Sequence, residues 1–356
     1  MQPRLPNVIK YLGSKRTLVP ALGEIATAVG ATSAVDLFTG TTRVAQEFKR
    51  RGIHTIATDL ATYSAVLAEC YIATDAATVD VGALGEELRR LNSLPGKAGY
   101  VTETFCEKAR FFQPHNGKRI DVIRDAIDSD HATGPLRPLL LTSLLLAADR
   151  VDSTTGLQMA YLKEWAPRSH RELELTAPLL LEGPGEAVRG DALETVGELA
   201  PVDLMYVDPP YNQHRYFTNY HVWETLIRWD RPDHYGIACK RVDSRDDAPR
   251  SAFNSKRTMR DALAGVLARA RAEVVVVSYN DESWVSADDV TGLLRAAGHE
   301  AVGVLEFDRK RYVGAQIGIF NGAGAKVGQV ARLRNTEYVF VAGPSAAVAA
   351  ALSTAR

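Results

Sequence analysis

Cysteine is scarce in this sequence. The chain of 356 residues holds three, Cys70, Cys106 and Cys239. Their spacing does not fit a metal-binding motif, and so few cysteines are typical of a reducing compartment. We therefore expect a cytoplasmic protein without a cysteine-based metal site.

Long apolar runs are also lacking. The most apolar stretch, residues 139–148, is about half the length that a membrane span needs, and it ends at Asp149 and Arg150. It reads as a buried helix. We find no signal peptide, internal repeat or low-complexity tract, so no membrane association is expected.

Neither sign of charge dominates, since 42 Lys and Arg face 43 Asp and Glu for a net charge of −1. The distribution is more informative than the total. Residues 228–260 hold nine Lys or Arg against five Asp, and residues 305–334 hold six against Glu306 and Asp308. A local basic surface is what contacts to phosphate require. In the second run, Arg309 and Arg311 are candidates for such contacts, with a solvated charged surface as the alternative.

The most informative stretch is 204–212, a hydrophobic run that leads into Asp208-Pro209-Pro210-Tyr211. Two prolines cannot continue a central strand. The chain must therefore leave the sheet at the carboxyl end of a strand, where open α/β folds bind ligands. The plain alternative is a strand that ends in a proline turn with a capping aspartate.

This set of groups suits the amino group and the flat face of a nucleobase. Asp208 can accept one N–H of an exocyclic amine, and the carbonyl of Pro209 can accept the other. Both bonds favour a nitrogen that is becoming tetrahedral, so they stabilise mainly the transition state. Tyr211 can stack on a base that has left its duplex.

A second pattern predicts a nucleotide site near the N-terminus. A short strand, a turn, a helix over residues 43–51 and a second strand place Asp36, Phe38 and Gly40 around the turn, with Asp59 19 residues beyond Gly40. An acid about 20 residues after such a turn binds ribose hydroxyls. Thr41 and Thr42 replace the glycines of a dinucleotide turn, so a nucleoside without pyrophosphate fits better than NAD. An ordinary βαβ unit remains the alternative.

Two weaker segments fit the same ligand. Residues 10–16 form a polar loop that contains Lys10, Tyr11, Gly13 and Lys15, and an apolar-periodic segment follows it over residues 18–29. Gly190-Asp191 precedes the strand that ends at Asp208, where a carboxylate can accept from an adenine amine. Pairs of this kind are more often turns.

Together these motifs resemble the D12 class, the Dam-like or class alpha family of DNA adenine-N6 methyltransferases. The resemblance rests on the Lys-aromatic-x-Gly-x-Lys loop, the Asp-x-Phe-x-Gly turn and Asp-Pro-Pro-Tyr, in that order. Residues 217–221, 274–280 and 335–341 match further family segments. Many relatives carry a second glycine where this chain has Thr42.

The resemblance implies S-adenosylmethionine as methyl donor. Asp36 would lie near the methionine end, Asp59 at the ribose hydroxyls and Asp191 at the adenine amine, and Lys10 and Tyr11 would close over the donor. Transfer would be a direct displacement in which positioning supplies most of the rate. A cytosine-C5 enzyme is disfavoured because no cysteine here follows a proline.

The region between the two motif groups is expected to recognise the target. Basic, aromatic and amide side chains that can reach phosphates and base edges gather at 110–119 and 161–165. The candidates for nucleic-acid contact are Arg110, Asn116, Lys118, Arg119 and Lys163, with Tyr220 in the later family segment. A role for the aromatic residues in the core is the alternative.

We expect an α/β fold, a doubly wound and mostly parallel Rossmann-like methyltransferase sheet with a smaller inserted helical domain. Residues 1–74 and 186–356 would be the two halves of the catalytic domain, and residues 75–185 the target-recognition domain. Strands are predicted near 34–38, 54–58, 186–189, 203–207, 274–278, 301–306 and 337–342, the last two as an antiparallel edge.

The leading functional hypothesis is a site-specific DNA adenine-N6 methyltransferase. Its partners would be double-stranded DNA and a cognate restriction endonuclease. An RNA or cytosine-N4 methyltransferase is the second hypothesis, and a non-catalytic nucleic-acid-binding module is the third. The missing pyrophosphate turn disfavours a hydride-transfer enzyme.

Overall fold

The computed structural model describes most of the chain. It covers residues 8–13, 15–210, 216–246, 251–310, 319–320, 326–328 and 334–354, with the backbone alone for residues 309–310, 319–320 and 326–328. Two predicted site residues, Tyr211 and Arg311, lie outside the described residues, as does the side chain of Arg309.

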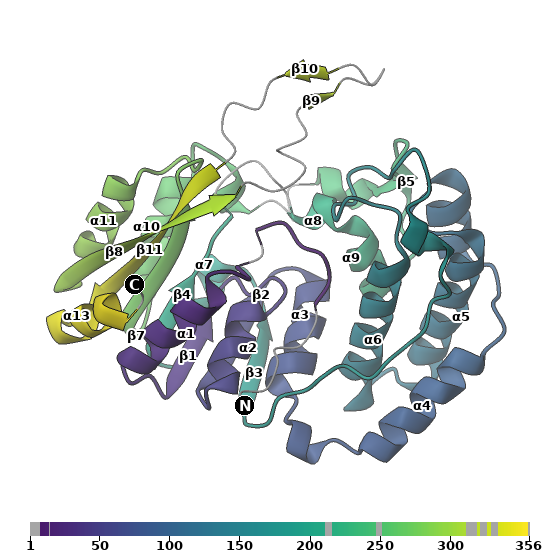
Figure 1. Ribbon diagram of the computed structural model, residues 1–356, viewed down its shortest axis with the longest axis horizontal. Helices are drawn as coiled ribbons and strands as arrows, with labels where there is room; N and C mark the ends of the chain where they lie inside the picture. The colour runs from purple at the N-terminus through teal and green to yellow at the C-terminus, as the bar shows by residue number, and fades with distance from the viewer. Residues whose placement is uncertain are drawn as a thin grey trace. The chain divides into compact units, whose positions relative to one another are not determined.

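A seven-stranded sheet organises the fold (Figure 1). Its order is β3-β2-β1-β4-β7-β11-β8. The strands are β1 (Ser33–Asp36), β2 (His54–Asp59), β3 (Gly185–Arg189), β4 (Val202–Val207), β7 (Ala272–Asn280), β8 (Ala301–Lys310) and β11 (Arg334–Gly343). All seven predicted strands are present, so the expected mostly parallel α/β sheet is confirmed.

Strand direction follows the prediction as well. β4 pairs in parallel with β1 and β7, and β2 pairs in parallel with β3. β11 runs antiparallel to both of its neighbours, β7 and β8. The last two strands therefore form the antiparallel edge that was expected, with β8 outermost.

The central strands form because they are apolar on both faces. β7 carries four consecutive valines, Val274–Val277, and all four are buried. β4 is buried along most of its length. Continuous hydrophobic runs of this kind are typical of strands with helices on both sides, whereas a strand with one wet face alternates.

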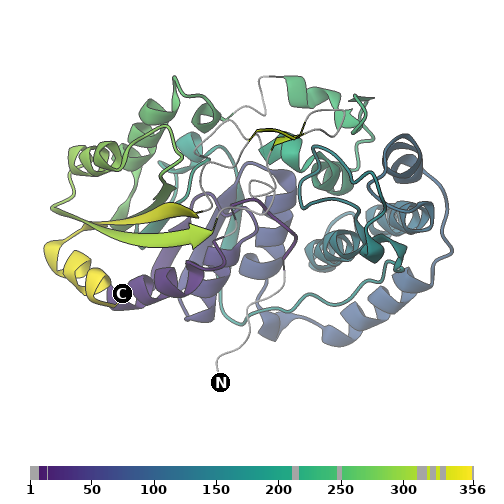
Figure 2. The same cartoon turned by 45° about the horizontal axis from the view of Figure 1, so that its top comes forward.

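Two compact units make up the chain. The second unit comprises Pro20–Phe38, Leu193–His214 and Ser251–Arg356. In it, α11 (Ala287–Ala296) and α13 (Ser345–Thr354) lie on opposite faces of the pair β8 and β11 (Figures 1 and 2). Its other helices are α10 (Met259–Arg269), which packs on α11, most of α1 (Val19–Ala28) and most of the short α7 (Ala192–Thr195).

The first unit comprises Met1–Val19, Thr39–Ala192 and Arg215–Arg250 and holds β2 and β3. Helices α2 (Arg43–Arg50) and α3 (Thr62–Ala68) pack on β2, and α6 (Leu136–Val151) contacts α3, α5 (Pro114–Asp130) and α9 (His221–Arg228) (Figure 1). Further helices are α4 (Val81–Ser93) and α8 (Tyr216–Asn219). A short hairpin of β5 (His234–Tyr235) and β6 (Lys240–Arg241) follows α9.

Helix α6 is the buried helix that the apolar run predicted. Every residue from Leu139 to Ala148 is buried, and most of them join the hydrophobic core of the first unit. Among the described residues, no helix combines the length and the apolar character that crossing a membrane requires. Helices α4, α5 and α6 fall within residues 75–185, and their role in target recognition stays a prediction.

Candidate active site

Asp208 leaves the sheet directly after β4, which ends at Val207. Its Oδ1 accepts a hydrogen bond from the Ser278 hydroxyl on β7 at 3.2 Å. The Ser278 oxygen also lies 2.6 Å from the Tyr206 hydroxyl. Because Ser278 and Tyr206 are both buried, these contacts orient the carboxylate at the carboxyl end of the strand. Ser278 was not among the predicted site residues, although a hydroxyl that ends a run of valines was a visible signal.

The two prolines follow as the sequence requires. Pro209 is buried and Pro210 is partly exposed, and neither residue continues the strand. Because proline has no N–H, each offers only a carbonyl acceptor beside the carboxylate of Asp208.

Asp36 ends β1, the strand beside β4. It is 1% exposed and pairs in register with Tyr206. The next residue, Leu37, donates its N–H to the Tyr206 carbonyl at 3.0 Å. Phe38 then packs edge-on against Phe253, with ring centroids 5.1 Å apart. The predicted residues of the two motifs in the second unit thus come from adjacent strand ends.

In the first unit, Asp59 ties the end of β2 to the turn that follows Phe38. Its Oδ2 accepts from the Gly40 N–H at 2.8 Å, and its Oδ1 accepts from the Ala61 N–H at 3.0 Å. Burial raises the pKa of the Asp59 carboxyl, and these N–H donors oppose that rise. The sequence spacing of Gly40 and Asp59 therefore reflects a direct contact.

Gly40 is a position where a side chain has no room. Its φ is +51°, and a Cβ added there would lie 3.0 Å from the Tyr11 ring. The left-handed conformation and the close approach both favour glycine. The bare backbone beside an aromatic ring and a carboxylate is a cradle that suits a nucleoside, which is the donor portion predicted from sequence.

Tyr11 belongs to a cluster of four tyrosines. Its ring stacks on Tyr220 at 4.7 Å and on Tyr216 at 5.3 Å, and Tyr63 lies at 6.5 Å. The Tyr220 hydroxyl accepts from the N–H of Leu12 at 2.5 Å. These contacts hold the N-terminal loop against α3, α8 and the residue that precedes α9. A Cβ at Gly13 in the same loop would meet the Tyr216 hydroxyl at 3.2 Å.

The two lysines of the loop are engaged within the protein. Lys10 lies 3.2 Å from Asp149 Oδ1 and 3.1 Å from Asp152 Oδ1, and it also donates to the Asp149 carbonyl. Burial raises the pKa of the Asp149 carboxyl to about 6, against the opposing charge of Lys10. Lys15 is buried, and its carbonyl accepts from the N–H groups at the start of α1. Lys10 could contact a bound methyl donor only while it also keeps, or gives up, these ion pairs with Asp149 and Asp152.

Asp191 follows β3, close to the end of β2. The N–H of its neighbour Gly190 donates to the Asp59 carbonyl at 3.1 Å. Asp191 is partly exposed at the start of α7. The structure therefore brings Asp191 to the same strand ends as Asp59 and Gly40.

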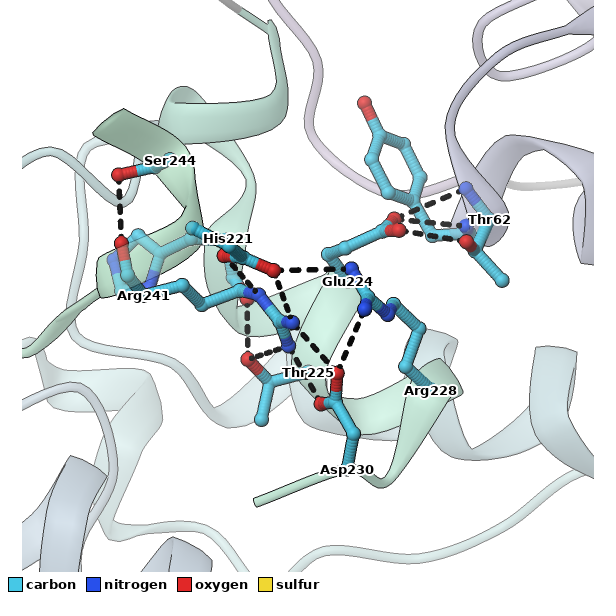
Figure 3. A network of polar contacts seen from close by, with 10 residues as sticks. Thr62, His221, Glu224, Thr225, Arg228, Asp230, Arg241 and Ser244 are labelled. Carbon is cyan, nitrogen blue, oxygen red and sulfur yellow. Dashed lines mark hydrogen bonds and ion pairs between the residues drawn. The ribbon is translucent and has the colours of Figure 1, made fainter. Parts of the chain in front are cut away.

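Two buried polar side chains fix α9, and neither was predicted. Glu224 on α9 accepts from Thr62 N at 3.0 Å, from Thr62 Oγ1 at 2.6 Å and from Tyr63 N at 3.4 Å (Figure 3). A carboxylate here satisfies the first N–H groups of α3 and favours its positive end. Gln158 caps α9 in the same way, since its Oε1 accepts a hydrogen bond from Val222 N at 2.9 Å.

His221 begins α9 in a closed environment. It is fully buried beside Phe105 and Phe111, and its Nε2 lies 3.0 Å from the Gln158 carbonyl. Burial lowers the pKa of His221 to about 3. The imidazole is therefore neutral near pH 7 and supports the packing of α9.

Comparison with protein families decides the kinship of the chain. A model of the D12 class N6 adenine-specific DNA methyltransferases matches residues 11–291. The chain belongs to this family. The match includes the N-terminal loop from Tyr11 onward, the turn at Gly40, the Asp-Pro-Pro-Tyr motif and β7.

Three relatives show the range of lengths in the family. Type II methyltransferase M.NlaIII of Neisseria lactamica is 29% identical over 305 residues, which cover 82% of this chain and 89% of that protein. Type II methyltransferase M.CviAII of Paramecium bursaria Chlorella virus 1 is 29% identical over 311 residues, with 82% and 89% covered. Modification methylase StsI of Streptococcus sanguinis is 28% identical over 306 residues, with 81% and 46% covered. The match thus spans less than half of the StsI methylase.

Of the predicted nucleic-acid contacts of this D12 family member, two lie side by side. Arg110 donates to the Lys163 carbonyl at 2.6 Å and lies over the Trp165 ring at 4.6 Å. Lys163 is exposed. The two predicted segments, 110–119 and 161–165, therefore meet at one cationic and aromatic surface. Lys118 is exposed farther along α5.

Three other candidates are committed to internal bonds. Asn116 is fully buried and its amide bonds the backbone at Ser169, Arg171 and Leu173. Arg119 donates to the Leu173 and Asn92 carbonyls. Tyr220 is fully buried in the tyrosine cluster. Contact with nucleic acid would require these bonds to break, so the structure gives Asn116 and Tyr220 interior positions in place of the expected surface.

Among the described residues, no group of three or more His, Cys, Asp or Glu could hold a metal ion.

Proposed function

We propose that this chain transfers a methyl group from S-adenosylmethionine to N6 of adenine at a specific sequence in double-stranded DNA. One observation carries the proposal: in a member of the D12 family, Asp208 stands at the carboxyl end of β4, with its carboxylate oriented by Ser278. The family and the fold imply use of S-adenosylmethionine, which supplies an electrophilic methyl group when bound.

Asp208 acts on the acceptor amine. Its carboxylate accepts one N–H of the adenine amino group, and the Pro209 carbonyl accepts the other. Both bonds strengthen as the nitrogen lone pair leaves conjugation with the ring, so they lower the barrier more than they tighten ground-state binding. Pro210 fixes the backbone for this geometry, and Tyr211 stacks on the base.

Residues at the other strand ends hold the donor. Asp59 binds the ribose hydroxyls, and Gly40 allows close approach of the backbone. Asp191 accepts a hydrogen bond from the adenine amino group of S-adenosylmethionine, while Asp36 and Phe38 contact the methionine portion of the donor. Tyr11 and Gly13 form the loop over the donor, supported by Lys10 and Lys15. The Gly40 backbone, Asp59 and the Tyr11 ring adjoin one another in the first unit, which fits a nucleoside.

The DNA contacts come from the inserted region. We assign target recognition to residues 75–185, with Arg110, Lys118 and Lys163 contacting the duplex and Arg309 and Arg311 adding phosphate contacts. The joined surface of Arg110, Lys163 and Trp165 supports this assignment. The names of the relatives, modification methylase and type II methyltransferase, support a role in a restriction–modification system with a cognate endonuclease.

A methyl-transfer assay tests the proposed function by identifying the nucleoside that receives the labelled methyl group. The purified chain is incubated with labelled S-adenosylmethionine and mixed-sequence duplex DNA, with RNA in a parallel reaction, and the products are digested to nucleosides. N6-methyladenine from DNA is the expected product, and its position maps the recognition sequence. Label in RNA or in N4-methylcytosine would replace the proposal with the second hypothesis. Donor binding without any transfer would favour the non-catalytic module.

The donor site is tested by Asp59→Asn. The amide keeps the size of the side chain but loses one acceptor and the charge, so we expect the Kd for S-adenosylmethionine to rise about tenfold or more. Isothermal titration calorimetry measures this change. An unchanged Kd in a variant that folds normally would remove Asp59 from the donor site.

A further inference from the structure

The hairpin of β5 and β6 presents one strongly exposed apolar side chain. Ile237 lies in its turn and is 80% exposed, the highest value for a large hydrophobic residue in the described part of the chain. Exposed aliphatic side chains are common singly and need no explanation by themselves. The way this turn is held makes Ile237 unusual.

The turn is anchored immediately beside Ile237. Ala238 and Cys239 are 7% and 3% exposed and belong to the hydrophobic core of the first unit. The Cys239 N–H donates to the Gly236 carbonyl at 3.0 Å, and Gly236 adopts a φ of +68°. Ile237 therefore projects from a fixed turn.

Backbone strain is concentrated around the same hairpin. In the described part of the chain, four non-glycine residues have a positive φ, and three of them are Trp229 (54°), Arg231 (47°) and Cys239 (46°). Such conformations persist only where the surrounding structure enforces them, and they gather at functional sites. The surrounding structure thus holds these residues in a backbone conformation that non-glycine residues disfavour.

A buried arginine braces the hairpin. Arg241 on β6 is 1% exposed and makes paired hydrogen bonds to Asp230, at 2.7 and 2.6 Å, and to Asp243, at 3.0 and 2.7 Å. Arg228 of α9 lies 3.0 Å from the same Asp230 carboxylate (Figure 3). This network joins the hairpin to α9.

Helix α9 in turn caps α3 through Glu224, as Figure 3 shows. The brace therefore continues from the hairpin to the helix that carries Tyr63 of the tyrosine cluster. A hairpin fixed in this way keeps the side chain at its tip in place against a binding partner, whereas a flexible loop would yield.

Two cationic side chains, Lys240 and Arg245, reach the surface beside the turn. Residues 228–246 hold five Lys or Arg against four Asp, and ion pairs join Arg228 and Arg241 to Asp230 and Asp243, and Arg231 to Asp125. Arg245 is exposed and stacks over Tyr235 at 3.7 Å, while Lys240 is partly exposed on β6. The carboxylates that remain beside the hairpin are Asp233 and Asp246.

The small apolar area of Ile237, a single side chain, favours DNA over a protein as the partner of the hairpin. A stable protein–protein interface buries about 800 Å² on each side, far more than one isoleucine offers. A base step in a duplex accepts a single apolar side chain, and proteins that unstack DNA use isoleucine, leucine, methionine or phenylalanine for this purpose.

We propose that Ile237 is an apolar wedge that enters the base stack of duplex DNA and stabilises the unpaired state of the target base. The inference rests on the proposed function, since an enzyme that modifies an amino group within a pair must first expose it. Arg245 and Lys240 hold the flanking phosphates.

The wedge is tested by Ile237→Ala on two substrates. One is the mapped target duplex, and the other carries an abasic site opposite the target adenine, so that the base is already unpaired. We expect kcat/KM on the paired duplex to fall about tenfold or more, and the two proteins to agree within about twofold on the abasic substrate. Ile237→Leu restores the rate on the paired duplex, because it keeps the apolar volume.

Controls separate this role from folding and from the proposed function. Val304→Ala removes another exposed apolar side chain, 41% exposed on β8, and leaves both rates unchanged. Equal rates for Ile237→Ala and the wild-type chain on the paired duplex would overturn the wedge, as would an equal loss on both substrates or a loss of donor binding. Absence of DNA methylation by the wild-type chain would instead refute the proposed function and the wedge with it.

Discussion

At the scale of single residues, the aspartates predicted for catalysis and donor binding lie at the ends of the predicted strands, and their roles stay predictions. Asp36 and Asp208 end or follow the adjacent parallel strands β1 and β4 in the second unit, and Asp59 ends β2 in the first unit. Asn116 and Tyr220 show the opposite case. Their polar atoms suggested a surface, but backbone groups distant in sequence, at 169–173 and at Leu12, bring them inside.

His221 gives a pH dependence that the sequence does not show. Its pKa falls from the usual 6.5 to about 3 because it is buried, so the unfolded chain binds a proton that the folded chain excludes. The stability that neutral His221 contributes is therefore present above pH 6.5 and is lost as the pH falls toward 3. We expect a slope of up to about 1.4 kcal/mol per pH unit below pH 6 from this residue.

Urea unfolding at pH 5 and pH 7 measures that slope. His221→Gln should flatten the dependence, since glutamine does not titrate, whereas His115→Gln on the exposed start of α5 should leave it unchanged. An identical pH dependence in the wild-type chain and His221→Gln would show that other groups cause the acid sensitivity.

At the scale of elements, hydrophobic runs and turn residues predicted all seven strands and the buried helix α6. The caps of α3 and α9 were not predicted, because their partners are remote in sequence. Glu224 caps α3 from 162 positions away, and Gln158 caps α9 from 64 positions away. Sequence signals for caps are local, within about four residues of the helix start, so a cap from another helix leaves no pattern.

The Glu224 cap should contribute measurably to stability. Glu224→Gln keeps one acceptor but turns an amide group toward the N–H donors of α3. We expect the free energy of unfolding to fall by about 1–3 kcal/mol. Glu86→Gln on the exposed face of α4 serves as the control and should change it by less than about 0.5 kcal/mol. If chemical denaturation gave both variants the same stability, the cap would be energetically neutral.

At the scale of the whole molecule, strand order is the feature that sequence left open. The last strand, β11, inserts between β7 and β8, so β8 forms the edge. Neither pattern nor spacing encodes this choice, which depends on pairing across the sheet. Membership in the D12 family and the placement of Asp208 were accessible from sequence, because the motifs that carry them are short, ordered and chemically constrained.

The most direct test of the proposed chemistry is the rate of methyl transfer to duplex DNA by Asp208→Ala, with donor affinity measured on the same sample. We expect the single-turnover rate to fall by about 10²–10³-fold, the loss typical when a preorganised transition-state hydrogen bond is removed. The Kd for S-adenosylmethionine should stay close to that of the wild-type chain. A wild-type rate in the variant would contradict the role of Asp208 as acceptor for the target amine.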